Sequence, residues 1–100
     1  MYIVREIFHL QFGKYKEAKA LLDEGIQTGI FKMTPGSRVL TDFTGKGYRL
    51  VLEMPFPSLA SFEQSLQQEM SETGWQEWYG KFKVLVLSSE REIMKLMKSL

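Results

Sequence analysis

The stretch that decides the fold is Tyr2–Phe12, YIVREIFHLQF, which runs directly into GKYKEAKALL. Large apolar residues stand at both even and odd positions of this stretch, so we expect a strand that is at least partly covered on both faces. Val4 shares one face with Glu6, whereas Ile7 shares the other face with His9. A strand of this kind suits the centre of a sheet, and the stretch that follows it has the pattern of a helix.

The next part of the chain alternates between helical and strand-like patterns. Apolar residues recur at three- and four-residue steps after Gly13, which predicts an amphipathic helix that ends before Gly29. A turn at 34–37 precedes two strands joined by a glycine-containing hairpin loop, and Ser58 is a suitable N-cap for a second helix. The predicted elements are a strand at Tyr2–Phe12, a helix at about Lys14–Gln27, strands at Arg38–Thr44 and Tyr48–Met54, the second closed by Pro55 and Pro57, and a helix from Ser58 that Gly74 interrupts.

The last quarter of the chain fits two interpretations. Six residues recur at helical spacing, namely Trp75, Trp78, Tyr79, Phe82, Leu85 and Val86. We favour a helix over this stripe, a break at Ser88 and Ser89, and a final strand over Glu90–Met97. The alternative is a strand at Val84–Leu87, since VLVL has high strand propensity, followed by a terminal helix over Arg91–Leu100.

The order strand, helix, two strands, helix, strand is that of a ferredoxin-like α+β fold. We expect one domain over residues 1–100, with one antiparallel sheet in a βαββαβ arrangement and the helices on one face. The opposite face of the sheet is predicted to carry Ile3, Ile7, Val39 and Val51. A bare apolar face predicts that two copies pair face to face, as a homodimeric α/β barrel.

Composition and charge exclude several classes of function. Thirteen basic and twelve acidic residues give a formal net charge of +1, so there is no electrostatic footprint for nucleic acid or for a membrane surface. The absence of cysteine excludes disulfides and thiolate zinc sites. One histidine without a nearby carboxylate pair predicts no metal site, and no motif indicates a cofactor. With no leader pattern and no apolar run of spanning length, we expect a cytoplasmic protein.

Two segments carry a resemblance to a known family. REIFHLQFGKYKEA at 5–18 and GWQEWYGKF…VLSSEREI at 74–93 resemble the dimeric α+β barrel superfamily, which includes NIPSNAP-like and antibiotic-biosynthesis-monooxygenase-like proteins. The resemblance to NIPSNAP-like proteins, over nearly the whole chain, implies a homodimer with a cleft of small-molecule size. Haem-degrading and quinol-oxidising monooxygenases with this barrel combine Asn, Trp and His in their sites. This chain has no asparagine, so we transfer none of their site residues.

A polar set on the first and third strands is one candidate site. Arg5 and His9 share a strand face, and Arg49 and Glu53 point the same way if the register allows. Arginine is a fixed charged donor and histidine titrates near neutral pH, so this set could bind an anionic or polar ligand. The alternative is that these residues form ion pairs at a dimer interface or lie at solvated strand ends. A slip of one residue in register would turn the whole set to the other face.

Trp75 and Trp78 are the second candidate, because an aromatic stripe could form the wall of a ligand pocket. The alternative is that the stripe is ordinary core, since large rings supply much buried area in a small domain. No serine has a recognisable nucleophile setting, so we assign no catalytic residue.

Three functions remain open. The first is a small homodimer that binds a small, anionic or partly aromatic molecule between sheet and helices. The second is a cofactor-independent enzyme of the monooxygenase or isomerase type that uses His9 with Arg49 or Arg5. The third is a structural or interaction module whose function is its dimer face.

Overall fold

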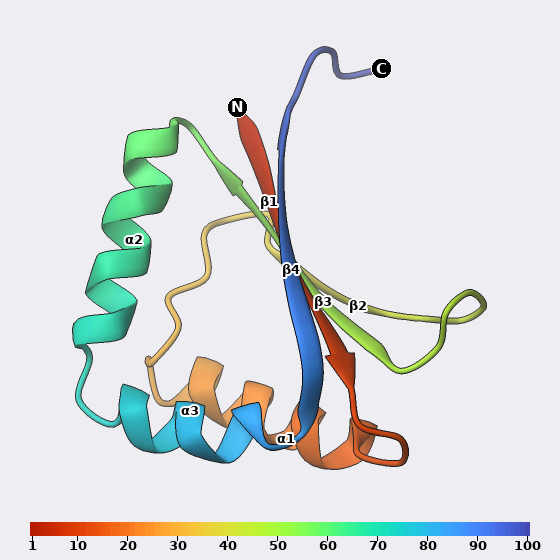
Figure 1. Cartoon of the computed structure of the whole chain (residues 1–100). Coiled ribbons are helices and arrows are strands. Elements are labelled where there is room, and N and C mark those ends of the chain that lie inside the picture. The colour runs from red at the N-terminus through yellow and green to blue at the C-terminus, as the bar shows by residue number, and fades with distance from the viewer.

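A computed structural model describes all 100 residues, and it confirms the predicted βαββαβ order and antiparallel sheet (Figure 1). The sheet order is β2-β3-β1-β4, so the first strand lies inside the sheet, between β3 and β4. All three helices lie on one side of the sheet (Figure 1). The elements are β1 (Tyr2–Leu10), α1 (Tyr15–Gln27), β2 (Arg38–Thr41), β3 (Arg49–Phe56), α2 (Leu59–Ser71), α3 (Trp75–Lys83) and β4 (Val86–Lys95).

The register of β1 decides which side chains face the helices. Val4 pairs with Met54 of β3 and Ile93 of β4, and it is completely buried. Even-numbered residues of β1 therefore face the helices, whereas odd-numbered residues face the side without helices. Ile7 on the helix-free face is also buried, at 8% exposed, because neighbouring side chains on that face cover it. The prediction of a central strand covered partly on both faces is confirmed.

Helices α1 and α3 form the main core with the sheet. Ala18 and Leu22 of α1 are buried, as are Trp78 and Phe82 of α3. The Trp78 indole Nε1 donates a hydrogen bond of 2.6 Å to the backbone oxygen of Leu21, which fixes α3 against α1. The stripe predicted from the sequence is therefore core at Trp78 and Phe82.

Helix α2 is different, because it has no buried residue. The Ser58 hydroxyl accepts from the backbone N–H of Ser61 at 3.1 Å, and the Ser61 hydroxyl accepts from the Ser58 N–H, which is the predicted N-cap in a reciprocal form. The helix ends before Gly74, whose φ of +89° suits glycine and separates α2 from α3. Its apolar stripe contacts the sheet only partly: Phe62 meets Phe56 edge-on with ring centroids 5.3 Å apart, and Leu66 and Met70 are not buried.

In the last quarter the favoured order of a helix and then a strand is confirmed, its bounds are corrected, and the alternative terminal helix is absent. Helix α3 ends at Lys83 and β4 begins at Val86, so the VLVL segment contains the turn after the helix and the start of the strand. The Leu85 backbone donates to Phe82 and accepts from Gln11, which joins the two elements in a tight turn. No break occurs at Ser88 and Ser89, because pairing with β1 extends the strand through them.

The middle strands also differ from the prediction. β2 ends at Thr41, and β3 runs through Pro55 to Phe56. Proline is tolerated there because β2 pairs with β3 only as far as Glu53, so no neighbour needs the missing N–H. Val39 pairs with Leu52, which faces the helices, and Leu40 is the apolar β2 residue on the helix-free face. The placement of Val39 on that face was therefore wrong by one residue.

No helix is both long enough and apolar enough to cross a bilayer.

Candidate functional site

The space between α2 and the sheet is a cavity of about 390 Å³. This volume is in the range of pockets that hold small organic molecules. Fourteen of its nineteen lining residues are hydrophobic, so it is chiefly suited to an apolar ligand. The hydrophobic lining residues are Phe8, Leu22, Phe31, Met33, Leu52, Met54, Phe56, Phe62, Leu66, Met70, Trp75, Trp78, Tyr79 and Phe82.

Aromatic rings dominate one wall of the cavity. Trp75 and Tyr79 are stacked with their ring centroids 4.8 Å apart, and Trp78 and Phe82 are stacked at the same distance. Each pair lies one helical turn apart on α3, which is why the rings are parallel. Phe31 meets Trp78 edge-on at 4.5 Å. The wall thus presents flat faces and edges that suit a planar ligand.

One end of the cavity is polar. Glu6 of β1 and Arg91 of β4 are direct neighbours in the sheet, and Arg91 Nε donates to Glu6 Oε1 at 2.5 Å. Burial raises the pKa of Glu6, and the Arg91 guanidinium opposes that change. Glu69 of α2 lies across from this pair and also lines the cavity.

Glu69 is the most perturbed acid of this site. Burial is the main cause that raises its pKa from 4.5 to about 7, and repulsion from the Glu6 carboxylate adds to the effect. Arg91 acts in the opposite direction but is already engaged by Glu6. A carboxyl group that titrates near neutral pH in an apolar cavity can accept or donate a proton under ordinary conditions.

Trp75 adds a free donor at this end. Its indole Nε1 is buried and has no hydrogen-bond partner in the protein. The N–H lies near enough to Glu69 to lower the pKa of that carboxyl slightly, although the two groups do not reach normal hydrogen-bond geometry. An unpaired buried donor is costly, so a group that accepts from it would stabilise the site.

The predicted polar set lies elsewhere, on the helix-free face. Arg5 Nε donates to Glu53 Oε2 at 2.9 Å, and Arg38 also pairs with Glu53. The Arg38 guanidinium is the main cause that lowers the pKa of Glu53, with Arg5 contributing. Glu92 lies 3.9 Å from Arg5, so basic and acidic side chains alternate across all four strands.

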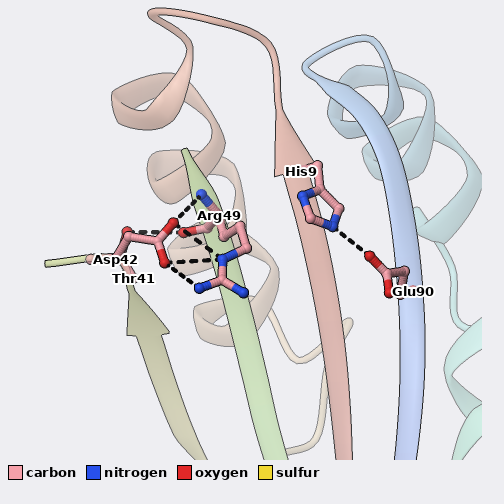
Figure 2. A network of polar contacts seen from close by, with 5 residues as sticks. All are labelled: His9, Thr41, Asp42, Arg49 and Glu90. Atoms are coloured by element: carbon pink, nitrogen blue, oxygen red, sulfur yellow. Dashed lines mark hydrogen bonds and ion pairs between the residues drawn. The ribbon is translucent and has the colours of Figure 1, made fainter. Parts of the chain in front are cut away.

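A second polar group lies on this face near the end of the sheet (Figure 2). The ring of His9 points toward Glu90, and its Nε2 lies 2.6 Å from Glu90 Oε1. Arg49 faces Asp42 instead, with Nη2 2.7 Å from Asp42 Oδ1, and this pairing lowers the pKa of Asp42. Thr41 donates to the backbone oxygen of Arg49 at 2.9 Å.

The structure therefore divides the predicted site residues into two groups. The four polar residues share the helix-free face, as their strand parity predicted: Arg5, His9, Arg49 and Glu53. Each already has a partner in the protein. Arg5 pairs with Glu53, Arg49 pairs with Asp42, and His9 contacts Glu90. Trp75 and Trp78 lie on the other side of the sheet and line the cavity. The two groups cannot contact one ligand, because the sheet separates them.

Sequence reasoning missed the charged residues of the cavity: Glu6, Glu69 and Arg91. Two of the three had a signal in the sequence. Glu6 stands among apolar residues on the core-facing side of the central strand, and Glu69 follows Phe62 and Leu66 at helical spacing. A charged residue inside an apolar pattern is the exception that points to a site. No group of three or more histidine, aspartate or glutamate side chains is arranged to hold a metal ion.

Comparison with solved structures finds the same α+β fold in several proteins. The chain superposes on a NIPSNAP domain protein from Burkholderia xenovorans with a TM-score of 0.81 and 13% identity, covering 96% of this chain and 94% of the other. A NIPSNAP family protein from Agrobacterium tumefaciens gives 0.79 and 24%, covering 95% and 92%. A putative antibiotic biosynthesis monooxygenase from Nitrosomonas europaea gives 0.70 and 13%, covering 98% and 100%.

These likenesses confirm the ferredoxin-like fold that NIPSNAP and monooxygenase-like proteins share. At these identities they describe the fold alone. The sequence matches no family model and no curated protein.

Proposed function

We propose that the protein is a homodimer that binds a small, largely apolar, aromatic molecule in the cavity between α2, α3 and the sheet. The observation that carries this proposal is the cavity itself: about 390 Å³, lined mostly by hydrophobic side chains. Helix α2 supports it, because an amphipathic helix with no buried residue leaves its apolar stripe to be covered by something other than the protein.

Blocking the cavity tests the binding half of the proposal. Leu66 lines the cavity from α2, so Leu66→Trp fills space that a ligand needs. Leu59 is on the same helix but is 49% exposed and does not line the cavity, so Leu59→Trp is the matched control. Small molecules extracted from the purified proteins with organic solvent are then compared by mass spectrometry. We expect a compound that is present in the parent and in Leu59→Trp and absent from Leu66→Trp.

The dimer half rests on the helix-free face of the sheet. Ile7, Leu40 and Val51 form an apolar band across three strands of that face, and ion pairs flank the band on both sides. Leu40 is 39% exposed in the single chain. An apolar band between self-paired charges suits a second copy of the same surface, because no charge is left without a partner on association.

Two adjacent residues of β2 give a sharp test of this interface. Leu40 and Val39 are similarly exposed, at 39% and 47%, but point to opposite faces of the sheet. Leu40→Lys places a charge in the proposed interface of both subunits, whereas Val39→Lys does not. Light scattering during size-exclusion chromatography should give a dimer for the parent and for Val39→Lys, and a monomer for Leu40→Lys. A dimer that persists in Leu40→Lys would show that the interface does not lie on this face.

A second candidate function is favoured by Glu69. An enzyme of the cofactor-independent monooxygenase or isomerase type needs a group that exchanges a proton near neutral pH. Glu69, whose pKa is raised to about 7 beside the aromatic wall, meets that need better than His9, which lies on the other face of the sheet. Turnover of a bound compound that is lost in Glu69→Gln while the compound is still retained would favour the enzyme. A dimer in which Leu66→Trp changes nothing would favour the purely structural module.

A further inference from the structure

The polar end of the cavity has two hydrogen-bonding groups that the protein leaves open. The Trp75 indole N–H is buried without a partner, and the Glu69 carboxyl makes no hydrogen bond of normal geometry. Trp78, by contrast, donates to a backbone oxygen, so its N–H is not open to a ligand. Trp75 and Glu69 both line the cavity, so a ligand atom that reaches both groups would give the indole N–H the partner it lacks.

The charges around this position restrict what that atom can belong to. Glu6 and Glu69 face the cavity together with a single cation, Arg91, which is already paired with Glu6. On the outer side of Glu69, Lys32 and Glu72 lie 3.9 Å apart and offset each other. An anionic ligand would meet a carboxylate with no free cation to balance it. The anionic ligand that we considered from the sequence therefore does not suit this cavity.

Hydrogen-bond capacity restricts the ligand further. Above about pH 7, where Glu69 is ionised, the indole N–H can only donate and the carboxylate can only accept. A hydroxyl oxygen is the group that accepts from the first and donates to the second at the same time. An amine lacks the acceptor when it is charged, and a carbonyl lacks the donor.

We infer that the cavity takes a neutral aromatic molecule with a hydroxyl group, whose oxygen accepts from Trp75 and donates to Glu69. This inference rests on the proposed function, because it names the chemical class of ligand for the same cavity. The aromatic wall of α3 holds the ring, and the Trp75–Glu69 pair holds the oxygen. A phenol or an aromatic enol belongs to this class.

Nitrogen-15 NMR tests the inference directly, because the chain has only two tryptophans and hence two indole N–H signals. The probes, added at about pH 8 where Glu69 is ionised, are 2-naphthol, 2-methylnaphthalene and 2-naphthoate, which share a ring system and differ in one substituent. We expect 2-naphthol to bind about tenfold tighter than 2-methylnaphthalene, since two added hydrogen bonds together contribute on that order. It should also shift the Trp75 indole proton downfield while the Trp78 signal moves less. 2-Naphthoate should bind more weakly than 2-methylnaphthalene.

Variants separate the hydrogen-bond pair from the cavity. Trp75→Phe keeps an aromatic ring without the N–H, and Glu69→Gln removes the charge at similar size. Each should reduce the preference for 2-naphthol over 2-methylnaphthalene, whereas Glu63→Gln, at an exposed position of α2, should keep it. Equal binding of 2-naphthol and 2-methylnaphthalene overturns the inference and leaves the proposed cavity intact. Failure of all three probes to bind, or binding that Leu66→Trp does not weaken, overturns both.

Discussion

The pKa of Glu69 makes a quantitative prediction about stability. A folded-state pKa raised from 4.5 to about 7 means that the folded protein holds this proton more tightly than the unfolded chain does. Below about pH 4.5 the Glu69 carboxyl is protonated in both the folded and the unfolded state, so its ionisation does not change the free energy of unfolding. The free energy of unfolding then falls as the pH rises, and the loss is complete above about pH 7.

The size of this loss follows from the pKa change. Each pKa unit corresponds to about 1.36 kcal/mol, so the change from 4.5 to about 7 gives at most ~3.4 kcal/mol. Glu69 keeps some contact with solvent, which reduces the expected loss to ~2 kcal/mol. Glu69→Gln removes the ionisation and should therefore stabilise the protein by ~2 kcal/mol at about pH 8, with little effect at about pH 4.5.

Urea denaturation at both pH values measures this effect, with parent and variant at one fixed protein concentration because association contributes to stability. Comparing the two proteins cancels the titration of all other groups. Glu63→Gln, at an exposed position of the same helix, is the control and should change stability by less than about 0.5 kcal/mol at both pH values. A Glu69→Gln effect that is the same at both pH values, or destabilisation at pH 8, would refute the reasoning.

Other variants test the packing around the site. A Cβ at position 25 would lie 2.7 Å from the ring of Phe31, so Gly25→Ala should lower the free energy of unfolding by about 1–3 kcal/mol. Gly80→Ala is the matched control: nothing lies within 4 Å of the added methyl group, and the better helix propensity should stabilise by about 0.5–1 kcal/mol in the same urea assay. Arg91→Met leaves the partly buried Glu6 carboxylate unpaired, so stability should fall by about 1–3 kcal/mol at pH 8 and by clearly less at pH 4.5; an equal loss at both pH values would mean that packing, not charge, is the cause.

The fold was largely predictable because local patterns and topology agreed. The apolar pattern of β1 indicated a central strand, and Ser58 and Gly74 marked the bounds of α2. The errors arose where pairing between distant strands decides the outcome. Val39 was assigned to the wrong face because the pairing of β2 with β3 determines its side, and a short strand exposed along its whole length has little pattern of its own.

The candidate site was less predictable, for a physical reason. The polar residues of β1 and β3 attracted attention because they cluster on one strand face, yet the structure pairs them with one another and with their neighbours. Glu69 becomes unusual only through burial and the approach of Glu6 from a different element. Arg91 lay inside the predicted final strand, but only the pairing of β4 with β1 decides that its side chain faces the cavity beside Glu6.

The central claim is that each subunit of a homodimer holds a small aromatic molecule in the cavity under α2. Native mass spectrometry of the protein as purified from its expression host tests it in one spectrum, because subunit number and retained mass are read together. The account predicts a dimer with a defined extra mass, up to two copies per dimer, that is lost on gentle activation. A monomer would contradict the paired sheets, and a dimer that stays bare even after addition of 2-naphthol would contradict the binding site.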